Sequence, residues 1–153
     1  MGPALVVLAW RRLQAIDRSM PHRDEEIAVL QQVAMLRVLP VPAIDGLALR
    51  VKHADIEEGT DVFRQGDVGD HLYVIADGEP NVVRDGRLLR TLRAGDAFGE
   101  IALLRKTTRT ATVRARTRLR LYTLDGSDFV SAISGYPSSS READTLMTTR
   151  LAT

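Results

Sequence analysis

The sequence contains no cysteine, few aromatic residues (5%) and no long apolar run. The absence of cysteine excludes disulfides, thiolate metal ligands and cysteine nucleophiles. No apolar stretch reaches the roughly 18 residues that a membrane-spanning helix needs. The net charge is only +1 over 153 residues, so the total does not indicate a protein covered with basic groups for nucleic acid. The composition is that of a single globular domain.

Motifs for catalysis are also missing. The chain has no Gly-x-Ser-x-Gly turn, no Gly-Lys-Ser/Thr phosphate loop and no Gly-x-Gly-x-x-Gly after a predicted strand. Its three histidines, His22, His53 and His71, are far apart and lack partners at metal-ligand spacing. We therefore predict no catalytic residues, no metal site and no enzymatic activity.

An apolar segment from Pro3 to Trp10, followed by Arg11-Arg12, begins the chain. In a secretory signal the basic residues precede the apolar run, so this order does not fit one. Eight to ten helical residues cover about 15 Å, roughly half of a bilayer core. Two interpretations of residues 1–23 stay open: a helix that packs on the domain, or the cytoplasmic end of a membrane helix followed by a linker.

Two helices are predicted next. The acidic residues Asp24-Glu25-Glu26 suit a helix N-terminus, and apolar residues then recur at helical spacing over 27–34. After a break at two prolines, a second helix is predicted over 42–49, with Pro42 in its first turn.

From Val51 onward the apolar period changes to two, and glycine-containing turns recur every seven to twelve residues. This pattern predicts an α+β fold, in which an antiparallel, jelly-roll-like β-roll of about eight strands is flanked by N- and C-terminal helices. A hairpin is predicted over 82–89 around Asp85-Gly86. Because Pro80 cannot donate to a ladder, its strand should lie at a sheet edge or start late.

The C-terminal third mixes strand and helix patterns. Residues 98–104 predict a short helix that begins at Gly99 within the strand region. Alternation over 113–122 predicts one continuous strand. Ser127-Asp128 is expected to cap the next helix, and the serines at 138–140 are expected to form a loop before a last helix over 142–151.

Basic residues are concentrated in this third. Seven lie between Arg105 and Arg120 with no acidic residue among them, which raises the question of nucleic-acid binding. Arginines 114, 116, 118 and 120 fall on one face of the predicted strand, however, and no aromatic residues are interleaved for base stacking. A solvated strand face is favoured. Arg109 breaks the alternation and needs another explanation.

Gly99, Glu100 and Arg109 could together form an anion site. The first N–H groups of a helix are unpaired and attract anions, and glycine lets a ligand approach the backbone closely. Arg109 follows ten residues later and could clamp the same phosphate, with Thr110 adding a hydroxyl donor. Glu100 would then suit a sugar hydroxyl. A salt bridge between Arg109 and Glu100 is the alternative, and the residues alone favour neither.

Three stretches of residues 36–134 resemble the cyclic-nucleotide-binding domain of the catabolite activator protein, of kinase regulatory subunits and of nucleotide-gated channels. Residues 65–75 (QGDVGDHLYVI) are similar to the turn-and-strand signature of the family. Residues 98–104 (FGEIALL) resemble its phosphate-binding cassette, and residues 109–113 (RTATV) resemble the arginine and strand that close this cassette.

The resemblance implies roles for individual residues. Arg109 would neutralise the cyclic phosphate, and Glu100 would accept a hydrogen bond from the ribose 2′-hydroxyl. The rest of the cradle would come from Gly99, Ile101, Ala102, Thr110 and Ala111. A threonine after the arginine resembles members that accept cGMP as well as cAMP. The purine would be capped by a residue of the last helix, for which Leu146, Met147 and Arg150 are candidates.

The resemblance also implies the organisation and function of the chain. Residues 24–134 would form the binding domain and residues 135–153 a lid helix. We expect a non-catalytic, cytoplasmic cAMP sensor; the alternative is an interaction module whose pocket no longer binds nucleotide. No helix-turn-helix DNA-binding domain follows in this chain. The apolar N-terminal run with Arg11-Arg12 is similar to the last helix of bacterial major-facilitator transporters that carry such a domain, which implies attachment at the cytoplasmic face of a membrane. A homodimer stays open.

Overall fold

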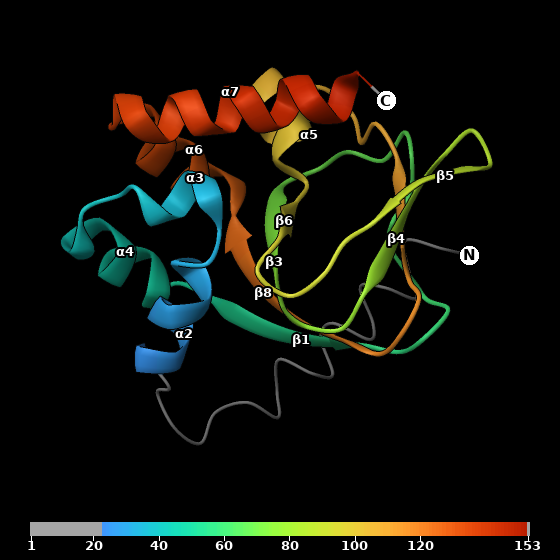
Figure 1. The fold of residues 1–153 in the computed structure, drawn as a ribbon, viewed down its shortest axis with the longest axis horizontal. Helices are drawn as coiled ribbons and strands as arrows, with labels where there is room; N and C mark the ends of the chain where they lie inside the picture. The colour runs from blue at the N-terminus through green and yellow to red at the C-terminus, as the bar shows by residue number, and fades with distance from the viewer. Residues whose placement is uncertain (1–22, 153) are drawn as a thin grey trace.

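The computed structural model describes residues 23–152, and the predictions for the N-terminal segment lie outside this range. Two four-stranded antiparallel sheets face each other as a β-roll, with helices gathered beside one sheet and along one end (Figure 1). The predicted fold class is confirmed. Within residues 23–152, no helix combines the length and the apolar character needed to cross a lipid bilayer.

The strands divide equally between the two sheets. The first sheet has the order β1 (Lys52–Ile56), β8 (Leu119–Asp125), β3 (His71–Asp77), β6 (Ala97–Phe98). The second has the order β2 (Asp61–Phe63), β7 (Thr112–Ala115), β4 (Pro80–Arg84), β5 (Arg87–Thr91).

The described helices are α2 (Arg23–Leu30), α3 (Ala34–Arg37), α4 (Val41–Ala48), α5 (Glu100–Arg105), α6 (Gly126–Ser134) and α7 (Pro137–Leu151). In Figure 1, α2, α3 and α4 lie beside β1 and β8, while α7 runs over α5 and α6. The prediction of one helix from Asp24 through Ala34 is wrong in one respect, because this segment divides into α2 and α3. Val33 between them is extended (φ −78°, ψ 122°), and this break lets α3 turn toward α7, against which it packs.

The β4–β5 hairpin is confirmed. Asp85 and Gly86 both have positive φ (53° and 76°), as a two-residue turn of the type favoured in hairpins requires. The edge position considered for the strand of Pro80 is wrong, because β4 pairs with both β7 and β5. Pro80 is tolerated because it is the first residue of β4, and its carbonyl accepts a hydrogen bond from the amide of Leu92 (2.9 Å).

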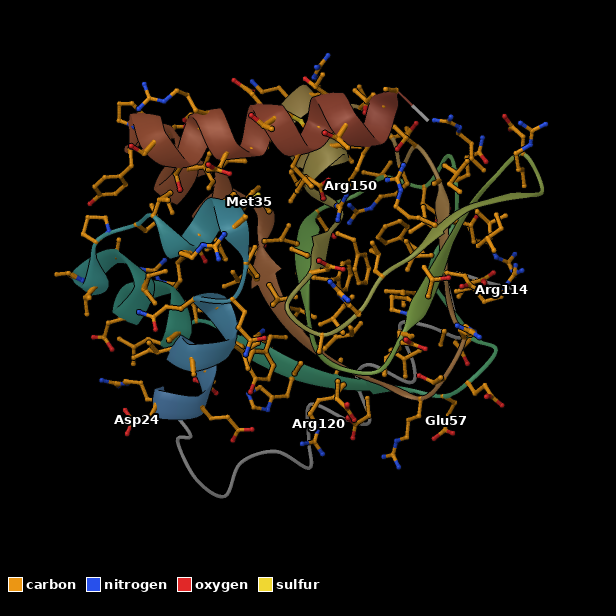
Figure 2. All side chains as sticks on the ribbon, viewed as in Figure 1. Asp24, Met35, Glu57, Arg114, Arg120 and Arg150 are labelled. Carbon is orange, nitrogen blue, oxygen red and sulfur yellow. The ribbon has the colours of Figure 1, made fainter. Side chains whose placement is uncertain are left out.

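The single strand predicted over 113–122 is two strands, β7 and β8, which belong to different sheets. The alternation predicted one strand because β7 and β8 both point apolar residues into the interior of the roll. It stops at Tyr122, which is buried on the opposite face, where the helices cover the sheet. The outward arginines are solvated as predicted (Figure 2), and Arg114 pairs with Asp61 (2.7 Å).

The C-terminal helices begin earlier than predicted. Residues 138–140 are not a loop, since α7 starts at Pro137. The buried hydroxyl of Ser139 donates to the carbonyl of Met35 in α3, so helix packing gives this serine a partner that the sequence pattern could not reveal. The N-cap of α6 is Asp125 rather than Ser127-Asp128.

Two apolar clusters hold the fold together. One joins the helices to the outer face of the β1–β8–β3–β6 sheet and includes Leu36, Leu72 and Phe129. The other fills part of the roll and includes Ile75 and Leu121. Strands β3 and β8 therefore bury both of their faces, and they support the helices on one side and a hollow on the other.

Candidate functional site

A hollow of about 530 Å³, part of it open to solvent, lies inside the roll beside α5 and the last turn of α7. All seven residues predicted for the cradle line it: Gly99, Glu100, Ile101, Ala102, Arg109, Thr110 and Ala111. Apolar walls come from both sheets, among them Phe63, Val82, Leu89 and Phe98. The sequence motifs thus meet in one concave place.

Arg109 is the most deeply buried cation of this hollow, with 3% of its surface exposed. Its Nη1 donates to the carbonyl of Gly99 (2.9 Å) and its Nη2 to the carbonyl of His71 (2.8 Å). Its Nε is buried and has no hydrogen-bond partner among the residues that the structure describes. Burial lowers the pKa of Arg109, and nearby acidic groups only partly offset this.

The loop between β2 and β3 holds Arg109 in place. The amide of Arg109 donates to the carbonyl of Asp67 (2.8 Å), and the amide of Gly66 donates to the carbonyl of Arg109 (2.8 Å). A Cβ on Gly69 would overlap Cζ and Nε of Arg109, so the guanidinium can lie in this place only with glycine at position 69. Gly99 has φ +94°, and a Cβ there would lie 2.7 Å from Nη1 of Arg109. Both glycines make room for the guanidinium.

Among residues 23–152, Glu100 is the only acidic residue that lines the hollow, and it is 1% exposed. Its Oε1 accepts a hydrogen bond from Nη1 of Arg150 (2.7 Å), whereas its Oε2 is buried without a partner. Figure 2 shows Arg150 beneath α7, at the mouth of the roll. The carbonyl of Arg150 accepts a further hydrogen bond from Nη2 of Arg90 (3.0 Å). Two contacts therefore tie the end of α7 to the hollow.

The alternative of a direct salt bridge between Arg109 and Glu100 is wrong, because each side chain has other partners. Within the described part of the chain, four arginines line the hollow but only one carboxylate does, that of Glu100; the arginines are 84, 90, 109 and 150. Burial and the neighbouring Arg150 lower the pKa of Arg90. The hollow is therefore positive, which suits an anion that also carries a hydroxyl group for Glu100.

Sequence reasoning missed the aromatic residues of the site. Cζ of Arg109 lies 4.1 Å from the centroid of the Phe63 ring and 5.8 Å from that of Tyr73. The available signal was that Phe63 lies just before the turn-and-strand signature and Tyr73 lies within it, in a chain with few aromatic residues.

Of the three candidates for a cap over the ligand, only Arg150 lines the hollow. Leu146 packs against the helical core, and Met147 is buried. Leu151, which is not among these candidates, also lines the hollow.

Comparison with known proteins gives the family. The family model for the cyclic nucleotide-binding domain matches residues 54–136. The chain is 41% identical over 103 residues to the cAMP-dependent protein kinase regulatory subunit of Schizosaccharomyces pombe, which covers 67% of this chain and 25% of that protein. It is 48% identical over 68 residues to the cGMP-dependent protein kinase egl-4 of Caenorhabditis elegans, which covers 44% of this chain and 9% of that protein.

Among solved structures, the regulatory domain of Toxoplasma gondii PKA in complex with cAMP matches with a TM-score of 0.70 and 29% identity. This match covers 76% of the present chain and 46% of that one. The chain spans a quarter or less of the two curated relatives. Since the family model matches residues 54–136 of 153, the chain belongs to the cyclic nucleotide-binding domain family.

Proposed function

We propose that this chain is a non-catalytic sensor domain that binds a cyclic nucleotide in the hollow. The observation that carries the proposal is a pair of unpartnered buried atoms, a donor on Arg109 and an acceptor on Glu100, in side chains that line the same hollow. Buried polar groups rarely stay unpaired, so each such atom marks a place where a ligand supplies the missing partner. Residues 24–134 form the binding domain in this proposal, and residues 135–153 form its lid.

The phosphate lies at Arg109 in this proposal. A buried guanidinium presents a planar set of donors that matches a phosphate, and the interior strengthens the attraction between them. The remaining donors come from Thr110 and from the backbone of Gly99, Ile101, Ala102 and Ala111, all of which line the hollow. Phosphate binding would supply Nε of Arg109 with the acceptor that it lacks.

The ribose lies at Glu100. The carboxylate is an acceptor only, and its Oε2 is available to a hydroxyl donor such as the ribose 2′-hydroxyl. The contact from Arg150 places a positive charge beside the buried carboxylate of Glu100, with its Nη1 2.7 Å from Oε1. Arg150 and Leu151, at the end of α7, are then placed to cover the ligand.

Both cAMP and cGMP are candidate ligands. The relatives named above include a cAMP-dependent and a cGMP-dependent kinase protein. Thr110, Arg84 and Arg90 line the hollow as donors, and an arginine can hydrogen-bond O6 and N7 of a guanine at once. These residues support cGMP as a ligand beside cAMP.

The competing function is an interaction module whose hollow no longer takes a nucleotide. One observation favours it: Arg150 already occupies one oxygen of the carboxylate that the ribose needs. In that case the end of α7 would fill the site permanently.

Calorimetry with cAMP, cGMP and 2′-deoxy-cAMP tests the proposal. Truncating one partner of a buried charged contact costs about 2–5 kcal/mol, so Arg109→Ala should weaken cAMP binding by roughly 30-fold or more. Glu100→Ala should remove the preference for cAMP over 2′-deoxy-cAMP. Arg116→Ala is the matched control, because Arg116 is exposed in the bend between β7 and β8 and does not line the hollow. Absence of binding by the unmodified protein at millimolar nucleotide would favour the interaction module.

A further inference from the structure

Three of the seven aromatic side chains of the protein gather beside one arginine. The Phe63 ring lies under Cζ of Arg109, with a separation of 4.1 Å. Tyr73 and Phe98 stack on each other (5.1 Å, 11°), and both lie within 6 Å of the Phe63 ring centroid. Because the chain has few aromatic residues, their concentration beside Arg109 distinguishes this site from the rest of the protein.

Arg109 has an unusual electrostatic environment for a buried charge. Buried charged groups normally have an oppositely charged partner, because the loss of hydration is costly. Among residues 23–152, no carboxylate forms an ion pair with Arg109; its hydrogen-bond partners are two carbonyl oxygens. The face of an aromatic ring attracts a cation without carrying a formal negative charge. Such a ring can therefore stabilise the guanidinium and leave its charge available.

We propose that Phe63 is the positioning residue of the anion site: its ring face holds the Arg109 guanidinium in the binding geometry without neutralising it. This inference rests on the proposed function. A carboxylate in the same place would hold the arginine equally well but would repel the phosphate. Gly69 also helps to position Arg109, because a side chain there would occupy the space of the guanidinium. The rings of Tyr73 and Phe98 contact the Phe63 ring at tilted angles, with centroid separations of 5.7 and 5.8 Å.

The first test compares Phe63→Leu, Phe63→Tyr and Phe129→Leu by calorimetry with cAMP and cGMP. Phe63→Leu should weaken binding by about 30-fold, which corresponds to the roughly 2 kcal/mol of one desolvated cation–π contact, and Phe63→Tyr should retain affinity within about threefold. Phe129 is fully buried in the helical core, away from the hollow. Phe129→Leu should lower the melting temperature and leave affinity unchanged. If it weakens binding as Phe63→Leu does, the proposal is overturned, because general loosening would explain both.

The second test examines the ligand-free protein by NMR. In the unmodified protein, the ring current of Phe63 should shift the Nε–H resonance of Arg109, and burial should slow its exchange with water. Both effects should be lost in Phe63→Leu and kept in Phe63→Tyr. If the protein binds no cyclic nucleotide but the Arg109 resonance depends on the ring, the proposed function fails while the positioning of Arg109 by Phe63 is supported. If Phe63→Leu lowers the affinity for nucleotide but leaves the Arg109 resonance unchanged, the proposal is overturned. A changed resonance with unchanged nucleotide affinity would also overturn it.

A non-natural substitution covers the case in which Phe63→Leu does not fold. Incorporating pentafluorophenylalanine at position 63 keeps the shape of the ring and removes the negative charge density of its face. The same replacement at Phe129 is the control. We expect weaker nucleotide binding only for position 63. Equal affinity of both fluorinated proteins would rule out a role for the ring face.

Discussion

Arg150 and Glu100 are fifty residues apart in the sequence, and Nη1 of Arg150 lies 2.7 Å from Oε1 of Glu100. Both side chains are buried or nearly so, with 10% and 1% exposure. The pair connects the last turn of α7 to the first turn of α5. The end of α7 and the hollow are therefore linked through a charged contact to the same carboxylate that the proposed ligand would use.

Removing Arg150 should destabilise the ligand-free protein. Arg150→Ala would leave the buried carboxylate of Glu100 without its cation, and breaking a buried pair in this way costs about 3 kcal/mol. The amides in the last turn of α7 should also exchange faster with solvent, because this contact holds the turn on the hollow. Urea unfolding and hydrogen exchange measure the two effects.

Arg141→Ala is the control for that experiment. Arg141 lies on the same helix, is exposed, and contacts Ser138 at 3.4 Å. Its removal should change stability by less than about 0.5 kcal/mol and leave exchange in the last turn unaltered. Unchanged exchange in Arg150→Ala would show that other contacts hold the lid closed.

Gly69→Ala should weaken nucleotide binding, although the substitution replaces no residue that contacts the ligand in our proposal. The added Cβ would overlap Cζ and Nε of Arg109, so the guanidinium must leave its slot. We expect at least tenfold weaker binding by calorimetry. Gly46→Ala is the matched control, because a Cβ at Gly46 in α4 has no neighbour within 4 Å. This change should stabilise the protein by about 0.5–1 kcal/mol with no effect on affinity. A Gly69→Ala protein with normal affinity would show that the arginine geometry is not required.

The sequence predicted the residues that line the hollow more accurately than it predicted how the strands and helices connect. Residues 98–113 follow each other closely, so local turns bring Gly99, Glu100 and Arg109 to one hollow, and the motif was sufficient to find them. The partners of these residues come from distant segments. Neither the contact of Arg150 with Glu100 nor the ring of Phe63 under Arg109 follows from spacing, since both depend on how α7 and β2 pack.

The errors in the strands and helices have a related cause. Alternation over 113–122 reports which residues face the interior, but it does not report that the chain passes from one sheet to the other within this segment. Residues 138–140 read as a loop from their composition, yet Ser139 is helical because its hydroxyl has an acceptor in α3. Tertiary contacts overrode local preference in both places.

Tyr73 should make the protein sensitive to alkaline pH. Burial raises the pKa of Tyr73 above its ordinary value of 10, with Asp70 adding to the shift and Arg109 opposing it. A folded-state pKa that is raised contributes stability below pH 10, and this contribution is lost as pH rises through the folded value. The free energy of unfolding should therefore fall more steeply above pH 10 in the unmodified protein than in Tyr73→Phe. Urea titrations across that range measure the slopes. Tyr136→Phe, at an exposed position, should match the unmodified protein. Equal slopes in all three would mean that Tyr73 titrates normally.

Arg90 should influence the choice between guanine and adenine. It lines the hollow from β5, and it can offer two donors to O6 and N7 of a guanine, whereas adenine has a donor in place of O6. A good bidentate contact of this kind discriminates by about 1–3 kcal/mol, so Arg90→Ala should shift the ratio of cAMP to cGMP affinity toward cAMP by roughly fivefold or more.

The side chain of Arg90 also donates a hydrogen bond to the carbonyl of Arg150. Arg90→Ala should therefore loosen the end of α7 and weaken the binding of cAMP and of cGMP to a similar extent. The ratio of the two dissociation constants separates these effects, because the lid contribution cancels in it. Arg87→Ala provides the control, since Arg87 is exposed on the same strand and does not line the hollow. A fall in both affinities with an unchanged ratio would assign Arg90 to the lid alone and leave the base to be read by other residues.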